Sequence, residues 1–443
     1  MLCGYLDKEQ PLSETSFNRS MYIEMAYVGV LLYCVSSILR PADWTDSFKG
    51  QPVDVVIFAF IALGALMAMD LDRWSSVASH PLLKIVLLHI VVTVLTAMLT
   101  LKPDLLIGQA FDYFRLFCVF IVFAIFVDTP SKVRGVFTLV IVLTTIVAYQ
   151  GIGLASTGVG LAGQDLYWGG RIRWVGMYNG ANVLCMLFVI TMAFVMQFIL
   201  GPWGWATRIF ALAAGGLIVN GIYLTNSRGG FLAFACVVGL SFLLRHKEML
   251  SRFSPKTLAA GALVIFLVLQ VAPSRMESIA DKEHSAAGRI DAWQEGIEMI
   301  KEHPLFGIGK GEWLNYHRRL AHNTFVQMMG ETGLVGLFFW LAMLYLMFRT
   351  LVQTLKKLED PQQQSLVTGI LVATCGFLIV SWFITTTQFD WTYIFVGLTA
   401  ATAVANNVRT ALSWKDVRWI TVIMLGGFVA VYVTVRMFYL VNG

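Results

Sequence analysis

Charged residues are scarce in this chain. They make up 13% of its 443 residues, against about 25% in an average soluble domain. So few charges cannot cover the surface of a soluble protein of this size, whereas a protein surrounded by lipid does not need them. The hydrophobic share of 57% and the mean hydropathy of +0.71 therefore indicate a membrane protein.

Several signatures of metal and cofactor chemistry are missing as well. The six cysteines form no CxxC pair, and all but Cys3 lie inside apolar runs, which argues against a zinc site or a disulfide framework. No Walker A, HExxH or GxSxG motif occurs, and the segments predicted below to face outward contain no DxD pair. We therefore expect chemistry without a metal or cofactor. The net charge of +5 does not indicate nucleic-acid binding, because basic residues in a membrane protein first report its orientation.

Long apolar runs recur along the whole chain. A membrane-spanning helix needs about 20 mostly apolar residues. Runs of this kind centre near residues 30, 61, 91, 118, 141, 190, 215, 236, 265, 341, 374, 398 and 428. They predict an all-α, polytopic fold of about 12–13 transmembrane helices, which form a single membrane domain over residues 1–443. Whether the last helix spans fully is left open.

Basic residues predict the orientation of this domain. If the N-terminus is cytoplasmic, the short inner links carry fifteen Lys and Arg, and the short outer links carry six. The positive-inside rule favours this orientation. Two outer segments are then long. One is residues 151–180, with the sequence RIRWVGMYNGAN, and the other is residues 274–323.

The second outer segment is expected to contain an amphipathic helix. In GRIDAWQEGIEMIKEHP, Gly288 precedes the helix and Pro304 ends it. Its apolar positions recur at helical spacing and share one face. We expect this helix to lie on the membrane surface as a lid over a cavity; the alternative is a surface anchor without a catalytic role. The residues on its apolar face are Ile290, Trp293, Ile297 and Ile300.

Three polar residues near the outer face suggest a reaction centre. Arg228 lies at the junction of two apolar runs, in TNSRGG, where a guanidinium beside a helix start can bind a phosphate. Arg289 begins the amphipathic helix, a position that is unfavourable for a cation and so suggests an anionic partner. His322 lies where the chain re-enters the membrane, and a histidine at this boundary can act as a general base. Each also has a simpler explanation, as a snorkelling arginine, a solvated arginine or an isolated interfacial histidine.

Two cations and one base on the same face suit one particular reaction. An acceptor hydroxyl deprotonated by the histidine would displace a diphosphate, whose charge the arginines would stabilise. The segment RIRWVGMYNGAN could add sugar stacking and phosphate pairing, or could simply form an interfacial aromatic belt. The candidate substrate-binding residues are Arg171, Arg173, Tyr178, Asn226, Trp293 and Asn323.

Three motifs occur in a fixed order: TNSRGGFLAF, GRIDAWQEGIEMIKEHPLFGIGKG and AHNTFVQMMGETGLVGL. Together they resemble the O-antigen ligase and polymerase superfamily of bacterial envelope proteins over about residues 220–345. The resemblance implies a membrane-embedded glycosyltransferase of the C type, metal-independent and inverting. It implies an undecaprenyl-diphosphate-linked glycan donor at the periplasmic face of the inner membrane. It also implies that Arg228 and Arg289 bind the diphosphate and that His322 is the base.

The acceptor remains open at this point. A ligase would transfer the glycan to lipid A-core, a polymerase would transfer it to another glycan, and a protein O-oligosaccharyl ligase would transfer it to a protein. Outside the enzymes, a transporter of lipid-linked glycans is the alternative. A transporter is expected to show two-fold internal repeats and charges near the bilayer midplane, whereas here no repeat is visible and the polar residues collect on one face. The expected partners are the lipid-linked donor, the acceptor and membrane lipids, with no nucleic acid.

Overall fold

The computed structural model describes residues 14–44, 53–68, 70–160, 163–245 and 279–442. Most of these residues are helical, and the only strands in the described part pair residues 167–168 with 171–172. The predicted all-α class is therefore confirmed. The elements are α1 (Glu14–Leu39), η1 (Pro41–Asp43), α2 (Val53–Ala68), α3 (Leu71–Ala78), α4 (Pro81–Met98), α5 (Pro103–Phe126), α6 (Pro130–Thr157), β1 (Tyr167–Trp168), β2 (Arg171–Ile172), η2 (Gly176–Tyr178), α7 (Ala181–Leu200), α8 (Trp205–Thr225), α9 (Arg228–Arg245), α12 (Ile279–Glu302), α13 (Trp313–Tyr316), α14 (Thr324–Lys357), α15 (Pro361–Ser381), α16 (Asp390–Ala405) and α17 (Trp414–Asn442).

The number of spans follows from the length and hydropathy of these helices. Within the described residues, ten helices are long and apolar enough to cross a membrane, or eleven if the pair α2 and α3, bent by 114°, counts as one. Helix α16 has only 16 residues and is not among them. The predicted run near residue 265 lies outside the described residues, and each of the other predicted runs is centred in a helix. A multi-pass membrane protein is thus confirmed.

Local sequence fixes where several spans begin. Four of them have proline at the first helical position, where its missing N–H would have had no partner in the helix. The side chains of Thr129 and Asp360 cap two of these helices by accepting backbone N–H groups. The four prolines are Pro81, Pro103, Pro130 and Pro361.

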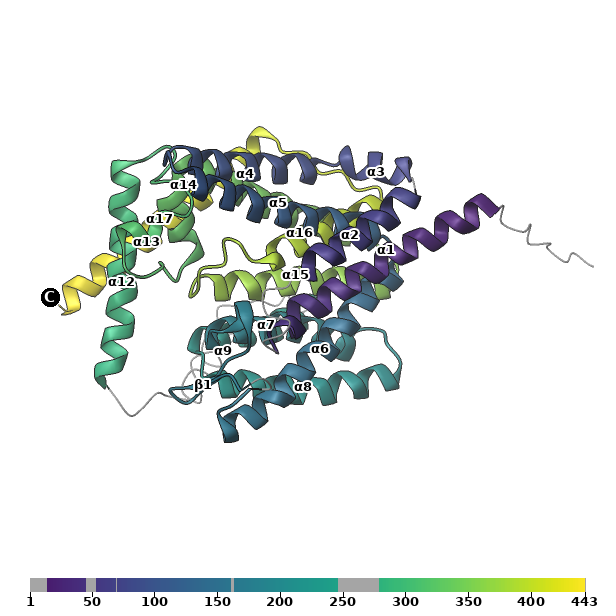
Figure 1. Ribbon diagram of the computed structural model, residues 1–443, viewed down its shortest axis with the longest axis horizontal. Coiled ribbons are helices and arrows are strands. Elements are labelled where there is room, and N and C mark those ends of the chain that lie inside the picture. The colour runs from purple at the N-terminus through teal and green to yellow at the C-terminus, as the bar shows by residue number, and fades with distance from the viewer. Residues whose placement is uncertain (1–13, 45–52, 69, 161–162, 246–278, 443) are drawn as a thin grey trace, which may run out of the picture.

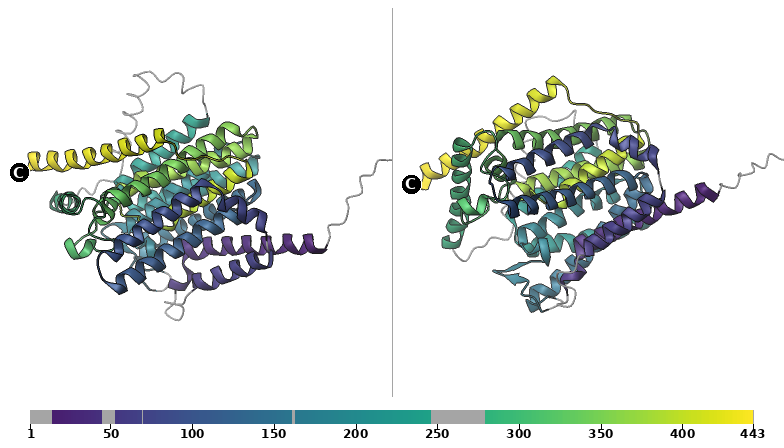
Figure 2. Two further views of the ribbon diagram at one scale, coloured as in Figure 1. Left: turned by 90° about the horizontal axis from the view of Figure 1, so that it is seen from above. Right: turned by 45° about the horizontal axis from the view of Figure 1, so that its top comes forward.

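The core of the bundle centres on α7. Almost all of its side chains are buried, against α8, α9 and α15. Helices α1 and α17 flank opposite sides of the bundle (Figure 2), and α17 exposes many large apolar side chains. Side-chain burial thus decreases from α7 to α17. This decrease is expected when the helices at the periphery of the bundle face lipid, because apolar side chains are stable there without burial in protein.

Polar contacts divide the links between helices into two ends. The outer end carries residues 40–44, 99–102, 163–180, 226–227, 303–323 and 382–389; the inner end carries residues 70–80, 127–129, 201–204, 358–360 and 406–413. Contacts within the outer end include Lys102–Glu312, Gln164–Asp43 and Arg171–Thr225. Contacts within the inner end include His80–Val408, Arg73–Asp128 and Gln362–Pro202. Each pair joins links that the sequence places on the same face, so the predicted alternation agrees with the structure over the described helices.

Helix α12 stands across the ends of the other helices at the outer end (Figure 1). Its predicted apolar face packs onto the bundle, with Ile290, Trp293 and Ile297 buried. The predicted start after Gly288 is wrong, because the helix already begins at Ile279. The nine residues before Gly288 contain neither glycine nor proline, so nothing in the sequence stops the helix there. Its end at Glu302, two residues before Pro304, is as predicted.

Candidate functional site at the outer end

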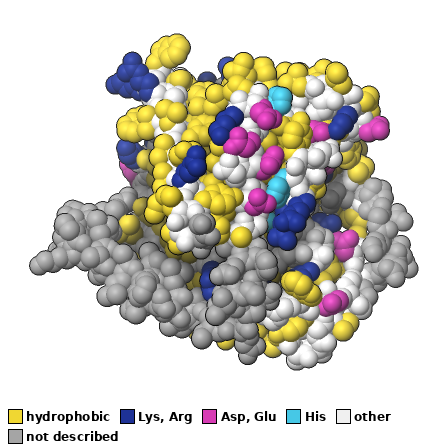
Figure 3. Space-filling view, turned by 90° about the vertical axis from the view of Figure 1, so that its left-hand side faces the viewer, with side chains coloured by type: hydrophobic (Ala, Val, Ile, Leu, Met, Phe, Trp, Pro, Cys, Tyr) yellow, Lys and Arg dark blue, Asp and Glu magenta, His cyan; other side chains and the backbone are white. Residues whose placement is uncertain are grey.

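The outer end is the polar face of a largely apolar molecule. Viewed from this side, acidic, basic and histidine side chains gather near the centre of the face among hydrophobic ones (Figure 3). Helix α12 and the 303–323 segment that follows it both carry acidic, basic and histidine residues at this end. Sites for polar chemistry on a lipid-embedded substrate are expected at such a boundary, where water and hydrocarbon meet.

One side-chain hydrogen bond joins the 303–323 segment to α12, and a second holds the segment's own fold. Trp293 Nε1 of α12 donates to Ala321 O at 2.9 Å. Trp313 Nε1 donates to Arg319 O at 2.7 Å. These bonds fix the backbone directly before His322. Both indoles are buried, so Trp293, proposed from the sequence as a substrate-binding residue, has a clear structural task here.

His322 lies beside two arginines. Its backbone adopts a left-handed conformation, with φ of 47°, which turns the chain from the 303–323 segment into α14. The His322 side chain is open to solvent on one side, and neighbouring atoms exclude part of the surrounding water on the other. This desolvation, and then the positive charges of Arg289 and Arg319, lower the pKa of His322 below its usual value. The structure thus brings together Arg289 and His322, which are 33 positions apart in the sequence. A neutral imidazole at neutral pH can accept a proton.

Asn323 and Asn226 flank the proposed centre. Asn323 caps α14, because its Oδ1 accepts Val326 N–H at 3.1 Å. Its Nδ2 is buried without a hydrogen-bond partner among the described residues, and so is Asn226 Oδ1 at the end of α8. Buried polar atoms are seldom left unpaired. These two amides therefore remain candidates to bind substrate.

Arg228 begins α9 at the turn that follows α8. Its guanidinium is exposed and forms no hydrogen bond or ion pair with a residue in the described ranges. Arg171 supports this turn, donating from Nε to Thr225 O at 2.8 Å and from Nη2 to Asn182 Oδ1 at 2.6 Å. Arg171 is thus anchored at the end of α8, at Thr225, three positions before Arg228 in the sequence. Substrate binding by Arg171 stays a prediction.

The link between α15 and α16 lies between Arg228 and His322. A Cβ at Gly229 would come within 2.6 Å of Phe383 in this link. The preceding residue, Trp382, packs edge-on against Trp293 of α12, with 6.3 Å between the ring centroids. On the other side, Thr324 Oγ1 donates to Ile384 O at 2.9 Å. Arg228 and His322 are therefore at the same end of the bundle, joined through one short link.

The rest of the first outer segment is mainly structural. Arg173 stacks on Trp168, with 5.1 Å between the guanidinium carbon and the ring centroid. Tyr178 is fully buried, and its hydroxyl accepts Trp391 Nε1–H at 3.1 Å. Substrate binding by Arg173 and Tyr178 stays a prediction. Because Tyr178 is buried, its side chain would have to become accessible before it could bind substrate.

Arg319 is a site residue that the sequence reasoning did not single out. Its guanidinium approaches Gly288, where a Cβ would lie 2.6 Å from Nη1, and it influences His322. The signal in the sequence was RRLAHN, a pair of arginines directly before the histidine. Arg318 and Arg319 look equivalent there, and only the fold distinguishes them.

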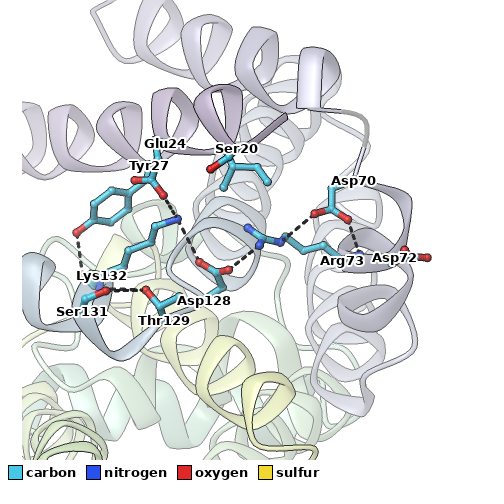
Figure 4. Close-up of a pocket in the computed structure, with 11 residues that line it drawn as sticks. Ser20, Glu24, Tyr27, Asp70, Asp72, Arg73, Asp128, Thr129, Ser131 and Lys132 are labelled. Carbon is cyan, nitrogen blue, oxygen red and sulfur yellow. Dashed lines mark hydrogen bonds and ion pairs between the residues drawn. The ribbon is translucent and has the colours of Figure 1, made fainter. Parts of the chain in front are cut away.

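Two cavities lie away from this centre. At the inner end, a cavity of about 830 Å³ is lined by an ion network in which Arg73 pairs with Asp128 and Lys132 pairs with Glu24 (Figure 4). A larger, mostly apolar groove of about 1060 Å³ opens between α1, α2, α3 and α5. Across the described ranges, no three His, Cys, Asp or Glu side chains are grouped so as to hold a metal ion.

The geometry defines a multi-pass membrane protein with a basic, histidine-containing centre under a surface helix. Residues 213–341, which contain this centre, match the family model described as O-antigen ligase. The chain is also similar to the exopolysaccharide production protein ExoQ of Rhizobium meliloti (strain 1021), with 28% identity over 225 residues. That match covers 44% of this chain and 51% of ExoQ, so it spans about half of either protein. Both matches support the resemblance to the O-antigen ligase and polymerase superfamily that the three motifs predicted.

Proposed function

We propose that this protein transfers a glycan from an undecaprenyl-diphosphate-linked donor to an acceptor hydroxyl, as an O-antigen ligase-like enzyme. One observation carries the proposal. His322, held beside Arg289 and Arg319, lies at the same end as Arg228, and all of them fall inside the segment that matches the family model. A base among cations suits a reaction that removes a proton from an alcohol and releases a diphosphate.

The proposed reaction is an inverting displacement without a metal. His322 takes the proton of the acceptor hydroxyl as its oxygen attacks the anomeric carbon of the donor sugar. The bond from that carbon to the diphosphate oxygen breaks, and the diphosphate leaves on its lipid. Arg228 and Arg289 bind the leaving diphosphate and stabilise its growing charge, because guanidinium groups match phosphate oxygens in charge and geometry.

Reconstitution tests this proposal. Purified protein in liposomes is given a lipid-diphosphate glycan and, separately, lipid A-core, a free glycan or an acceptor protein. Transfer to lipid A-core, with release of undecaprenyl diphosphate and with activity that survives EDTA, is the expected result. Loss of activity with EDTA and its return with magnesium would contradict the metal-free mechanism. Absence of transfer to every acceptor would contradict the proposed activity.

A polymerase is the second candidate, and the similarity to ExoQ favours it, since that protein is described as acting in exopolysaccharide production. The same centre would then serve, with a second lipid-linked glycan as the acceptor. Gel analysis of the products separates the two. A ligase gives one addition per acceptor, whereas a polymerase gives a ladder of repeats. A protein O-oligosaccharyl ligase would instead give glycosylated protein.

We further propose that the protein lies in the bacterial inner membrane with the centre facing the periplasm. The distribution of basic residues supports this orientation, with fifteen at the links assigned to the cytoplasm and six at those assigned to the periplasm. A lipid-linked donor presented on the periplasmic leaflet would then meet Arg228 and Arg289 at the membrane boundary.

A further inference from the structure

A buried ion pair lies beneath the candidate site. Lys310, in the sequence FGIGKGEW, pairs with Glu331 of α14, and their side chains are 4% and 3% exposed. Removing two charges from water is costly, and hydrophobic residues often replace such a pair without loss of stability. Glu331 also lies near the outer end of a candidate span, where charge is rare and is commonly functional. The pair therefore requires an explanation beyond packing.

Helix α14 is broken next to this pair. Gly333 has φ of 62° and ψ of −164°, which interrupts the helix. The backbone groups freed by the break are bound by the 304–309 stretch of the chain. Leu334 N donates to Pro304 O at 2.9 Å, and Gly309 N donates to Glu331 O at 3.0 Å. A break inside a span is tolerated only when protein satisfies its backbone groups, so this loop and the two halves of α14 form one unit.

Lys310 extends this unit to a third segment. Its ammonium donates to Thr387 Oγ1 at 3.2 Å as well as to Glu331. Gly311 N–H donates to the other oxygen of the carboxylate at 3.2 Å. Thr387 lies in the link between α15 and α16, the same link whose residue Ile384 binds Thr324 beside His322. Lys310 thus contacts two segments that both lead to the proposed base.

The chain between Lys310 and His322 is short and fixed at several points. Only eleven residues separate them. Trp313 packs against Gly330, where a Cβ would lie 2.7 Å from the indole. The indole Nε1 of Trp313 donates a hydrogen bond to Arg319 O. Ala321 N donates to Gln327 Oε1 at 3.1 Å. A displacement of Lys310 would therefore also displace Arg319 and His322.

We propose that the Lys310–Glu331 ion pair is a positioning pair, which holds the 304–323 segment in the break of α14 and so sets the place of His322 beside Arg289 and Arg319. Neither residue touches the substrate. The inference rests on the proposed function, since it assigns these residues to the geometry of the same centre.

The test uses the full-length protein in liposomes and the double variant Lys310→Met/Glu331→Met. Removing both charges together leaves no unpaired buried ion, so this variant is expected to fold. Its kcat should fall at least tenfold, while the KM for the donor changes less. Lys301→Met is the matched control, because it removes an exposed ion pair with Glu298 at the end of α12, and it should stay within twofold of the wild type.

Two further readouts separate positioning from simple stability. If His322 moves away from Arg289 and Arg319, the pKa of His322 rises, so the ascending limb of the pH–rate profile should move to higher pH. The reversed pair Lys310→Glu/Glu331→Lys should recover part of the lost kcat. A double Met variant with wild-type kcat and an unshifted limb would overturn the proposal.

Hydrogen–deuterium exchange gives a measurement that does not need activity. In the double Met variant, amides between residues 304 and 323 should exchange at least tenfold faster than in the wild type, whereas those of α7 should not change. Equal exchange in both proteins would refute the positioning role even if no glycan is transferred. Absence of transfer by the wild type, in contrast, would count against the proposed function alone.

Discussion

The imidazole of His322 faces two positive charges, and this decides what it can do. Arg289 and Arg319, together with desolvation, favour its neutral form. A neutral ring accepts a proton but is a poor donor, so the environment suits a base that acts on an acceptor alcohol. In the proposed reaction Arg289 also binds the leaving diphosphate, together with Arg228, so Arg289 takes part in both halves of that reaction.

His322→Ala is expected to lower the rate of glycan transfer by about 100-fold or more, since general-base catalysis contributes roughly 10²–10⁴-fold. Membrane insertion should be unchanged, because the His322 side chain is exposed. His303→Ala is the matched control, as it removes an exposed histidine near the end of α12. Transfer rates in liposomes, normalised to folded protein, give the comparison. Full activity of the His322 variant would remove this residue from the role of base.

Arg319→Ala is expected to shift the pH dependence of transfer. A base works in its neutral form, so the rate rises as pH increases through its pKa. Arg319 lowers the pKa of His322; its removal raises that pKa and moves the ascending limb to higher pH. Arg318→Ala should leave the limb in place, since His322 is influenced by Arg319 and not by its neighbour. The profile of kcat/KM between pH 5 and 9 measures the shift, and identical profiles for both variants would contradict the assignment.

At the scale of the elements, α14 depends on its break. Gly333 has a positive φ, and a Cβ there would lie 2.5 Å from Gly307 N and Leu305 O. Gly333→Ala is therefore expected to destabilise the protein by at least about 1–2 kcal/mol, the cost of left-handed backbone for a residue with a side chain. Gly216→Ala in α8, where a Cβ meets nothing within 4 Å, should be neutral or slightly stabilising. Thermal unfolding of both variants in detergent, followed by tryptophan fluorescence, compares their stabilities. Equal unfolding temperatures of the two variants would contradict the break of α14 at Gly333.

Periodicity in the sequence predicted the elements better than it predicted the site. The spacing of Ile290, Trp293 and Ile297 identified the buried face of α12 correctly, because helical burial depends on local repeat. The same reasoning misplaces the start of this helix, because a glycine such as Gly288 is typical of a helix boundary. In the structure Gly288 lies inside the helix and gives Arg319 room to approach. That contact joins distant segments, and no local pattern encodes it.

Pairs of residues that are distant in the sequence could not be predicted either, because no local pattern encodes their contact. Lys310 stands in a stretch that reads as a glycine-rich turn, and Glu331 stands in a stretch that reads as a span. Each looks unremarkable until the break at Gly333 brings the loop into α14. The resemblance singles out Arg228, Arg289 and His322 because their motifs are short and specific, and their roles stay predictions. The contacts that hold them became visible only in the fold.

For the whole molecule, the central question is which end faces the periplasm. The contacts divide the links into two ends, and the excess of basic residues predicts that the inner end faces the cytoplasm. Trp168 and Glu359 are exposed at opposite ends of the bundle. In a variant whose native cysteines are replaced, a cysteine introduced at either position reports the side on which it lies.

Trp168→Cys is expected to react with a membrane-impermeant maleimide in intact spheroplasts, because the β1–β2 turn lies at the end assigned to the periplasm. Glu359→Cys, in the link between α14 and α15, should react only after the membrane is permeabilised. Each variant serves as the control for the other. The reverse labelling pattern would place His322 in the cytoplasm. A lipid-linked donor presented to the periplasm could not then reach it, and the proposed reaction would have to draw its donor from the inner leaflet.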